Sequence, residues 1–228
     1  MLITIIITCC VSTASSYRVK SDKEVEKLAI EIIQKADEKA IYTLYTWSIG
    51  QRGDFYIFSK NAKDSNCLYC VYFNKNKRII RVSLQDFECF NIDFKCRIEN
   101  HLNQYRYLVF EKTEANNVRI TGKINTSDIV LIKEVQINDL FPETNPFDTF
   151  STLSELIVDW EIISSTSRQK IGNFIELSLL PQHKLTYLPD SLYIDPRYKE
   201  QWMKKFATGK MLNKNWNLRK LDKPHEYY

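Results

Sequence analysis

The chain has 228 residues, of which 44% are hydrophobic, 26% charged and 13% aromatic, and its 32 basic and 28 acidic residues give a net charge of +4. This composition excludes an intrinsically disordered chain, which has few aromatic residues and a large charge imbalance. Only 5 glycines are present, well below the usual share of about 7%, so glycine-rich phosphate-binding loops are excluded. The length suits one domain, or one domain with a smaller appended region.

Residues 1–16 differ from the rest of the chain and predict a secretory signal peptide. The run 2–8 is apolar and uncharged, and small residues follow it up to Tyr17, as in an export signal and its cleavage site. It is too short to cross a bilayer, which takes about 20 apolar residues. We therefore expect a periplasmic or secreted protein with no transmembrane span. Cys9 and Cys10 leave a lipid-modified N-terminus as an alternative.

Four cysteines follow the predicted signal, and we expect them to form disulfides: Cys67, Cys70, Cys89 and Cys96. An even number of cysteines in an exported chain favours this outcome. Three connectivities are possible, and proximity in the chain favours Cys67–Cys70 with Cys89–Cys96. A zinc site is the alternative, but the second pair is too widely spaced for a zinc knuckle. A redox pair at Cys67 is disfavoured because strand-like residues, rather than a helix, follow it.

Residues 17–141 are predicted to form a domain in which one helix packs on an antiparallel meander sheet. Ser21 and Glu24 have the spacing of a capping box, and apolar residues at steps of three and four then predict a helix to about Ala40. Short runs of β-branched and aromatic residues predict the strands, and nothing between them is long enough for a crossover helix. The predicted strands are 41–47, 54–58, 68–73, 78–84, 105–111, 117–121 and 129–135.

Residues 138–148 contain two prolines and are expected to be a linker. Residues 149–228 are predicted to form a mostly helical, basic C-terminal region, either separate or part of one continuous domain. A second capping box begins at Thr152, and Asp195 is followed by a proline, as at the start of a helix. The expected fold class is therefore α+β.

The last part of the chain carries the clearest electrostatic pattern. Residues 197–223 contain nine basic and two acidic residues, a net charge of +7, which leaves −3 on the other 201 residues. Basic residues interleaved with aromatic ones attract anionic partners. The residues predicted to bind a partner are Lys204, Lys205, Lys210, Lys214, Trp216, Arg219 and Lys220. The simpler interpretation is a helix whose Trp202 and Phe206 pack inward while its other face is basic.

The sequence predicts no catalytic, cofactor-binding or metal-binding residue. Ser167 and Lys170 match the Ser-x-x-Lys pattern, in which a lysine assists a serine nucleophile, but the companion Lys-Thr-Gly is absent. The three histidines, His101, His183 and His225, are scattered along the chain without a partner at helical spacing.

The expected function is that of an exported, non-catalytic binding protein, such as a periplasmic inhibitor or an immunity protein that occludes its partner. The expected partner is an acidic protein or an anionic component of the cell envelope, and nucleic acid is disfavoured if the chain is exported. Two alternatives stay open: an envelope hydrolase acting on cell wall or lipid, and an envelope-associated structural component.

Overall fold

The computed structural model describes residues 20–61, 68–98, 102–125 and 128–223. The predicted signal peptide lies outside these residues. The described helices are α1 Asp22–Lys35, α2 Glu38–Thr46, α3 Leu84–Phe94, α4 Ile137–Leu140, α5 Pro146–Asp159 and α6 Pro196–Ala207, with a short 3-10 helix at Leu102–Gln104. The strands are β1 Ser48–Arg52, β2 Phe55–Asn61, β3 Leu68–Asn74, β4 Ile79–Ser83, β5 Tyr107–Lys112, β6 Asn117–Lys123, β7 Ile129–Gln136, β8 Ser164–Ser167, β9 Ile175–Leu180, β10 His183–Tyr187, β11 Lys210–Met211 and β12 Trp216–Lys220.

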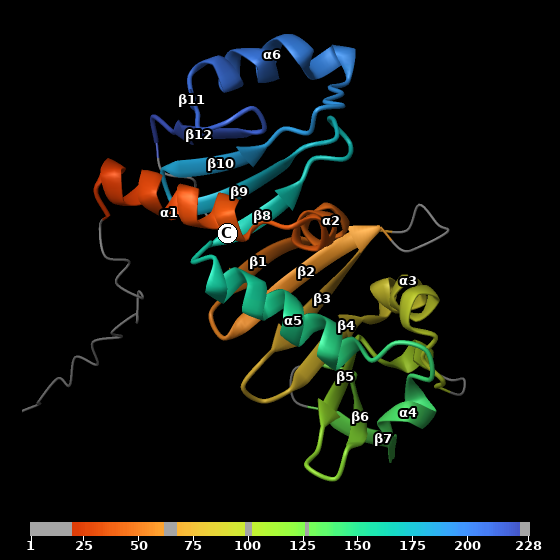
Figure 1. Ribbon diagram of the computed structural model, residues 1–228. Helices are drawn as coiled ribbons and strands as arrows, with labels where there is room; N and C mark the ends of the chain where they lie inside the picture. The colour runs from red at the N-terminus through yellow and green to blue at the C-terminus, as the bar shows by residue number, and fades with distance from the viewer. Residues whose placement is uncertain (1–19, 62–67, 99–101, 126–127, 224–228) are drawn as a thin grey trace, which may run out of the picture.

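These strands form one twelve-stranded antiparallel sheet in the order β11-β12-β10-β9-β8-β1-β2-β3-β4-β5-β6-β7 (Figure 1). The strands β1 to β7 follow one another as a meander, which confirms the predicted antiparallel pairing in this half. The C-terminal strands join the same sheet where β8 pairs with β1, with Ile49 opposite Ser165. The backbone N–H of Ser167 also donates to Ser48 Oγ at 3.1 Å, so the sheet continues across the predicted linker.

The main core lies between the sheet and the helices α1, α3, α4 and α5, and aromatic rings dominate it. Phe150 of α5 is fully buried and stacks on Phe58 of β2, with ring centroids 5.0 Å apart. Trp47, which follows α2, meets the same Phe150 ring edge-on at 5.4 Å. These contacts bury large apolar areas, which is the main favourable term in folding.

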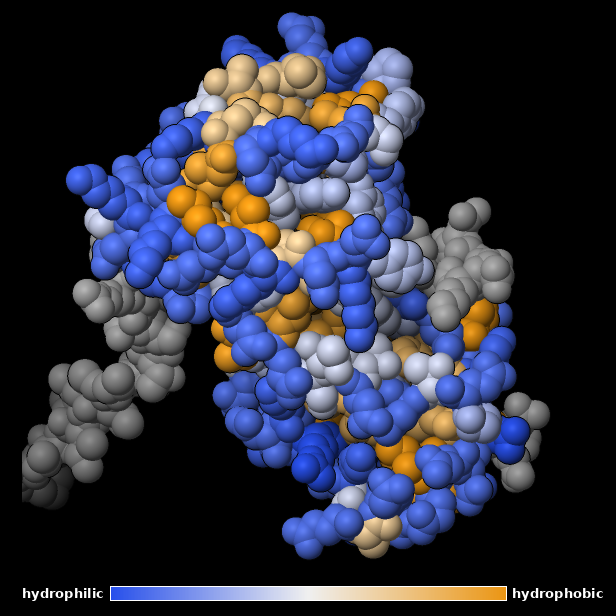
Figure 2. Space-filling model, viewed as in Figure 1, coloured by the Kyte–Doolittle hydropathy of each residue, from blue (hydrophilic) through white to orange (hydrophobic). Residues whose placement is uncertain are grey.

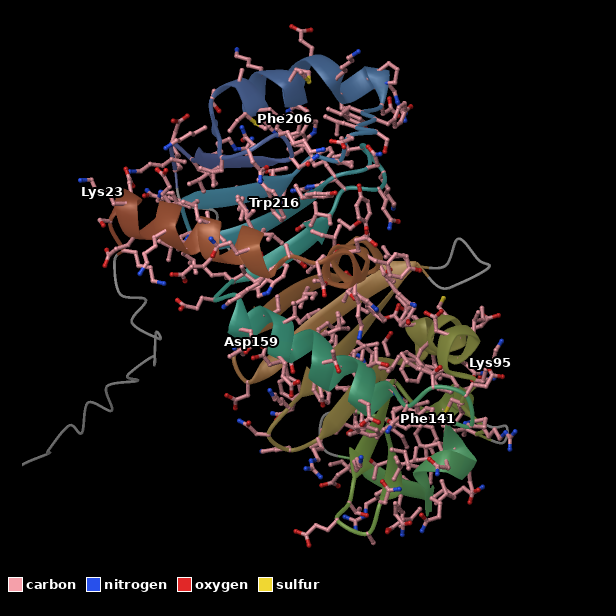
Figure 3. The ribbon with its side chains drawn as sticks, in the orientation of Figure 1. Lys23, Lys95, Phe141, Asp159, Phe206 and Trp216 are labelled. Carbon is pink, nitrogen blue, oxygen red and sulfur yellow. The ribbon has the colours of Figure 1, made fainter. Side chains whose placement is uncertain are left out.

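A second, smaller core lies under α6. Trp202 and Phe206 of this helix pack on Phe174, whose ring centroid is 4.7 Å from that of Trp202. Figure 3 shows Phe206 pointing from α6 toward the strands. Residues alternate between the two faces of a strand, so Leu177 and Leu185 join the main core while Glu176 and Lys184 face α6. The sheet therefore presents a polar surface to this helix.

The prediction of a mostly helical C-terminal region is wrong, because five of the twelve strands lie after residue 160. Composition did not indicate these strands. The strand β8 contains only serine and threonine, and in β12 the apolar Trp216 and Leu218 alternate with the polar Asn217 and Arg219. The cap at Asp195 is confirmed: its carboxylate accepts from the Arg197 backbone at 2.9 Å.

The predicted first helix is divided in two. The capping box of Ser21 and Glu24 is confirmed, but α1 ends at Lys35. Asp37 then caps a new helix by accepting from the Ala40 backbone at 2.7 Å. Residues 41–47 are therefore mostly helical, although their β-branched and aromatic composition favours a strand. The cap and the packing of α2 on β1 and β8 override this preference.

Two other helices also differ from the prediction. Residues 84–94 form α3, which begins at a Ser83 cap and which the sequence interpretation missed. The helix predicted to begin at Thr152 begins at Pro146 instead, because Asn145 caps it and proline suits the first helical position. Part of the expected linker is therefore helical.

The predicted cysteine pairs are wrong. Cys70 and Cys96 are free thiols, and burial raises the pKa of both. Cys89 is disulfide-bonded, and its partner lies outside the described residues, as does Cys67. Because Cys89 lies inside α3 and Cys96 beyond its end, seven residues of near-helical chain separate them by about 10 Å, which is too far for a bridge.

The substitution Phe150→Ala tests the central aromatic contact. We expect it to lower the free energy of unfolding by about 3–5 kcal/mol, because it removes a fully buried ring and leaves a cavity. Denaturant unfolding followed by tryptophan fluorescence measures this change. The matched control is Val158→Ala on the exposed side of the same helix, which should change stability by less than about 0.5 kcal/mol. Equal effects of the two substitutions would contradict the assigned packing.

Candidate functional site

The residues predicted to bind a partner lie in different environments. Trp216 is buried and packs on Tyr187 with ring centroids 5.1 Å apart, so it is unavailable to a partner. Lys210 is paired with Glu26 of α1 at 2.5 Å, and Lys214 is paired with Asp190. These exposed pairs neutralise part of the predicted basic surface.

The other four residues line one pocket between α6 and the sheet, with a volume of about 520 Å³. Its lining residues are Arg168, Glu176, Lys184, Gln201, Trp202, Lys204, Lys205, Thr208, Arg219, Lys220, Leu221 and Asp222. We call this the basic pocket. The structure thus brings Lys204, Lys205, Arg219 and Lys220 together and leaves the other three predicted residues outside.

A buried carboxylate organises the interior of the basic pocket. Glu176 has an exposed fraction of 3% and binds two guanidinium groups. Arg168 Nε donates to Glu176 Oε2 at 2.7 Å, and Arg219 Nη2 donates to Glu176 Oε1 at 3.0 Å. Charge-assisted pairs of this kind fix the orientation of both arginines.

Lys184 adds a third cation beside these arginines. It is 6% exposed, and its Nζ donates to Ser178 Oγ at 2.5 Å. Burial lowers the pKa of Lys184, while the charge of Glu176 opposes this change. The strand register explains the grouping, because Lys184 stands opposite Ser178 on β9 and Arg219 on β12.

Trp202 forms an apolar wall of the same pocket. The ammonium of Lys205 lies 4.0 Å from the centroid of its ring, and the guanidinium carbons of Arg168 and Arg219 lie 5.5 and 5.9 Å away. These are cation–π distances. Burial lowers the pKa of Lys205 as well.

The charge balance of the lining makes the basic pocket a candidate anion site. Six lining residues are cationic and two, Glu176 and Asp222, are acidic. Because Lys220 is paired with Asp22 of α1 outside the lining, the excess is three positive charges. In addition, Arg219 Nε is buried and makes no hydrogen bond within the described part of the chain. A buried N–H donor without a partner is unusual. Because the atom is buried, an anionic oxygen in the pocket would satisfy it only after local rearrangement.

The sequence interpretation missed Arg168, Glu176 and Lys184. They lie outside the basic segment of residues 197–223, and only the strand register brings them to it. One signal was available: between Ile175 and Leu179 the strand alternates apolar residues with polar ones. This indicates a second face that is polar, and its burial under α6 is visible only in the structure.

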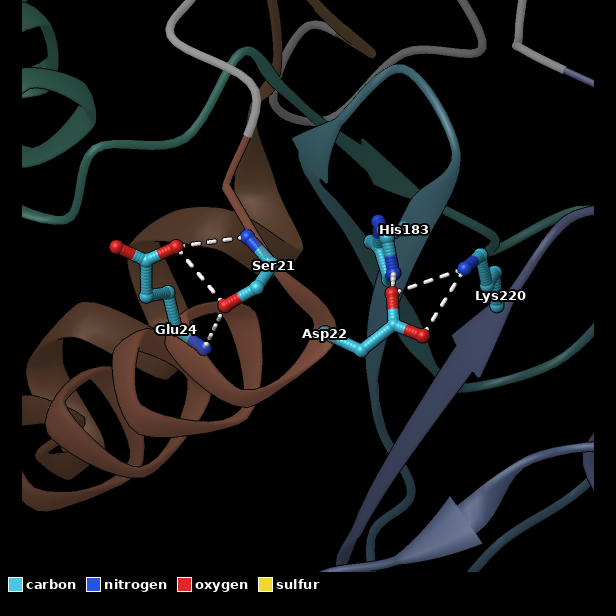
Figure 4. A network of polar contacts seen from close by, with 5 residues as sticks. All are labelled: Ser21, Asp22, Glu24, His183 and Lys220. Atoms are coloured by element: carbon cyan, nitrogen blue, oxygen red, sulfur yellow. Dashed lines mark hydrogen bonds and ion pairs between the residues drawn. The ribbon is translucent and has the colours of Figure 1, made fainter.

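The histidine at the start of β10 joins a polar network that anchors α1 and shares Lys220 with the basic pocket (Figure 4). Asp22 lies 3.2 Å from His183 Nε2 and accepts from Lys220 Nζ at 2.9 Å. The hydrogen bond from Lys220 lowers the pKa of the Asp22 carboxyl below its usual value. This network ties the N-terminus of α1 to β10 and β12. His101 and His225 lie outside the described residues.

Two further pockets contain titratable groups. In one, of about 460 Å³, Lys60 pairs with Asp93 at 2.9 Å. In the other, of about 350 Å³, Ser167 and Lys170 both contribute to the lining. The described residues contain no cluster of histidine, cysteine and acidic side chains that could hold a metal ion. Within those residues, no helix is both long and apolar enough to span a membrane.

Comparison with known proteins adds no functional information: no protein-family model, curated protein or solved structure matches the chain.

The substitution Glu176→Gln tests the buried ion cluster. Removing one partner of a buried ion pair leaves uncompensated charge, so we expect the free energy of unfolding to fall by about 3–5 kcal/mol. Denaturant unfolding at neutral pH measures the loss. Glu155→Gln is the control, because Glu155 forms an exposed pair with Lys75 and should change stability by less than about 0.5 kcal/mol. A similar small effect at both positions would show that Glu176 does not hold the cluster.

The substitution Asp22→Asn tests the anchor of α1. Since the folded-state pKa of Asp22 lies below its value in the unfolded chain, ionised Asp22 stabilises the fold at neutral pH, and this contribution is lost as pH falls through the folded-state pKa. We therefore expect the variant to melt below the wild type at pH 7, and the difference to shrink as the pH falls below about 3.9, the pKa of Asp in the unfolded chain. Thermal unfolding at a series of pH values provides the measurement, and a difference that stays constant with pH would contradict the prediction.

Proposed function

We propose that the chain is a non-catalytic binding protein that recognises an anionic partner through the basic pocket. The observation that carries this proposal is the excess of three positive charges around a pocket whose buried Arg219 Nε has no partner among the described residues. Charge complementarity of this kind accelerates association and selects among partners.

The proposed partner is an acidic protein, and the proposed role is that of an inhibitor or immunity protein that occludes it. In this form the chain acts outside the inner membrane, as residues 1–16 predict. The surroundings of the pocket suit a polar interface. Hydrophilic side chains separate the apolar patches on the face seen in Figure 2, and Lys204 of α6 is exposed at the pocket rim.

There are two alternatives to this proposed function. An envelope-associated structural component would use the basic pocket to bind an anionic envelope molecule. An envelope hydrolase that acts through a serine nucleophile would use Ser167, which lines one pocket with Lys170. Ser167 Oγ is buried, however, so a substrate could reach it only after local rearrangement. Labelling of Ser167 by a serine-reactive fluorophosphonate would favour the hydrolase.

The test compares two double variants of equal charge. The probe is a fluorescent glutamate-rich peptide, and its affinity is measured by fluorescence anisotropy at low salt. Lys204→Gln with Lys205→Gln removes two cations of the pocket, and we expect about a tenfold or greater loss of affinity. Lys210→Gln with Lys214→Gln removes two cations of the same segment that are paired elsewhere, and affinity should change little.

The matched charges make the outcome decisive. If both double variants weaken the peptide equally, the attraction is a property of net charge and the pocket is not the binding site. If neither variant weakens it, the proposed function is wrong. Affinity should also fall as salt rises, because salt screens the charges at the exposed rim.

A further inference from the structure

We propose that the group held by the basic pocket is a phosphoryl group, the dianionic tetrahedral end of a phosphate ester or of free phosphate. This inference rests on the proposed function for the location of the site and adds the chemistry of the ligand. Three observations carry it: an unsatisfied donor on an arginine that lines the pocket, the size of the charge excess, and the burial of the Trp202 ring.

The first observation is the hydrogen-bonding state of Arg219. Its Nη2 is bound to Glu176, whereas its Nε is buried without a partner in the described residues. A guanidinium stays protonated at any physiological pH, so this N–H is a permanent donor fixed in direction by the bond to Glu176. Arginine donors of this kind match the oxygens of phosphate and carboxylate groups.

The second observation separates phosphate from carboxylate. Glu176 already places one carboxylate between Arg168 and Arg219, and three positive charges remain in excess around the pocket once the pair of Lys220 with Asp22 is counted. A phosphate monoester carries close to two negative charges and three acceptor oxygens at neutral pH, so it compensates more of this excess than one further carboxylate. Burial lowers the pKa of Lys184 and Lys205, and a nearby dianion would favour their charged forms.

The third observation concerns Trp202. Its side chain is almost fully buried, with an exposed fraction of 4%, and Lys205 lies over its ring at 4.0 Å. A nucleobase needs an accessible aromatic face on which to stack, and this ring does not offer one. The pocket therefore recognises the phosphoryl group itself rather than an attached nucleobase. The pocket volume of about 520 Å³ also leaves room for the molecule that bears it.

The phosphoryl group has three possible sources: free phosphate, a soluble phosphate monoester, or the headgroup of an anionic phospholipid. The experiment uses the full chain and three probes at matched ionic strength: inorganic phosphate, glycerol phosphate, and phosphatidylcholine vesicles containing phosphatidic acid. Acetate and the glutamate-rich peptide serve as carboxylate probes. Calorimetric titration gives the affinities of the soluble probes, vesicle sedimentation gives lipid binding, and the Arg219 side-chain Nε–H resonance reports occupancy directly.

We expect phosphate or glycerol phosphate to bind at least about tenfold more tightly than acetate and to shift the Arg219 Nε–H resonance. Lys184→Met and Lys205→Gln should each weaken phosphate binding by about tenfold, whereas Lys214→Gln should leave it unchanged. Lys205→Gln is included because Lys205 is less buried than Lys184. If Lys184→Met fails to fold, the Lys205 variant still tests the proposal. Preferential binding to the phosphatidic acid vesicles would assign the lipid source.

The outcomes separate this inference from the proposed function. If acetate and phosphate bind equally, or if Arg219 Nε–H does not respond, the phosphoryl assignment is overturned. Pocket-dependent binding of the acidic peptide would still support the proposed function in that case. If phosphate binds through Lys184 and Lys205 while the peptide does not depend on the pocket, the acidic-protein proposal fails and the phosphoryl site stands.

Discussion

The region between the sheet and α6 depends on the carboxylate of Glu176. It lies on β9 with Arg168 on one side and Arg219 on the other, and it is nearly inaccessible to solvent. Without this carboxylate, two guanidinium groups and the ammonium of Lys184 would face one another under a helix, in a setting where unpaired charge is costly. Glu176 therefore makes a cationic pocket compatible with a folded C-terminal half.

The basic segment at the end of the chain divides into two kinds of residue. Lys210 and Lys220 pair with Glu26 and Asp22 of α1, and so they attach the first helix to the last strands across nearly the whole length of the chain. Lys204 and Lys205 of α6 line the pocket, and Lys220 lies in the lining as well as in the pair with Asp22. One charged stretch thus serves both the closure of the fold and the site. The net charge of a segment does not separate these roles, whereas the position of each cation relative to α1 and α6 does.

Local signals in the sequence predicted local structure well. The capping box at Ser21 and the cap at Asp195 depend on neighbouring residues, and both helix starts are where the sequence places them. The strands β2 to β7 were also predicted, because each contains a short run of β-branched and aromatic residues. Prediction failed where a distant contact overrides composition. Residues 41–47 favour a strand in isolation, but the Asp37 cap and the packing against β8 make them mostly helical.

The site was predictable only in part for the same reason. The sequence indicates Lys204 and Lys205 as charges on a helix, whereas only the strand register brings Arg168, Glu176 and Lys184 into the site.

The turn after α6 requires a glycine. A Cβ at Gly209 would come within 2.3 Å of Asn217 Oδ1, and Asn217 Nδ2 donates to the Phe206 carbonyl at 3.1 Å. Glycine there is required by β12 beside it, since α6 itself ends at Ala207.

Attaching α6 through a layer of buried charges costs desolvation free energy. An apolar layer of similar volume would be as stable or more so, because buried ion pairs lose solvation that their mutual attraction only partly returns. An apolar contact of this kind lies nearby, where Phe174 packs on Trp202 and Phe206. The chain therefore combines both under one helix: aromatic contacts hold α6 in place, and the ionic cluster beside them fixes Arg219 in the lining of the basic pocket. Stability alone accounts for the first arrangement, and the proposed recognition of an anion would account for the second.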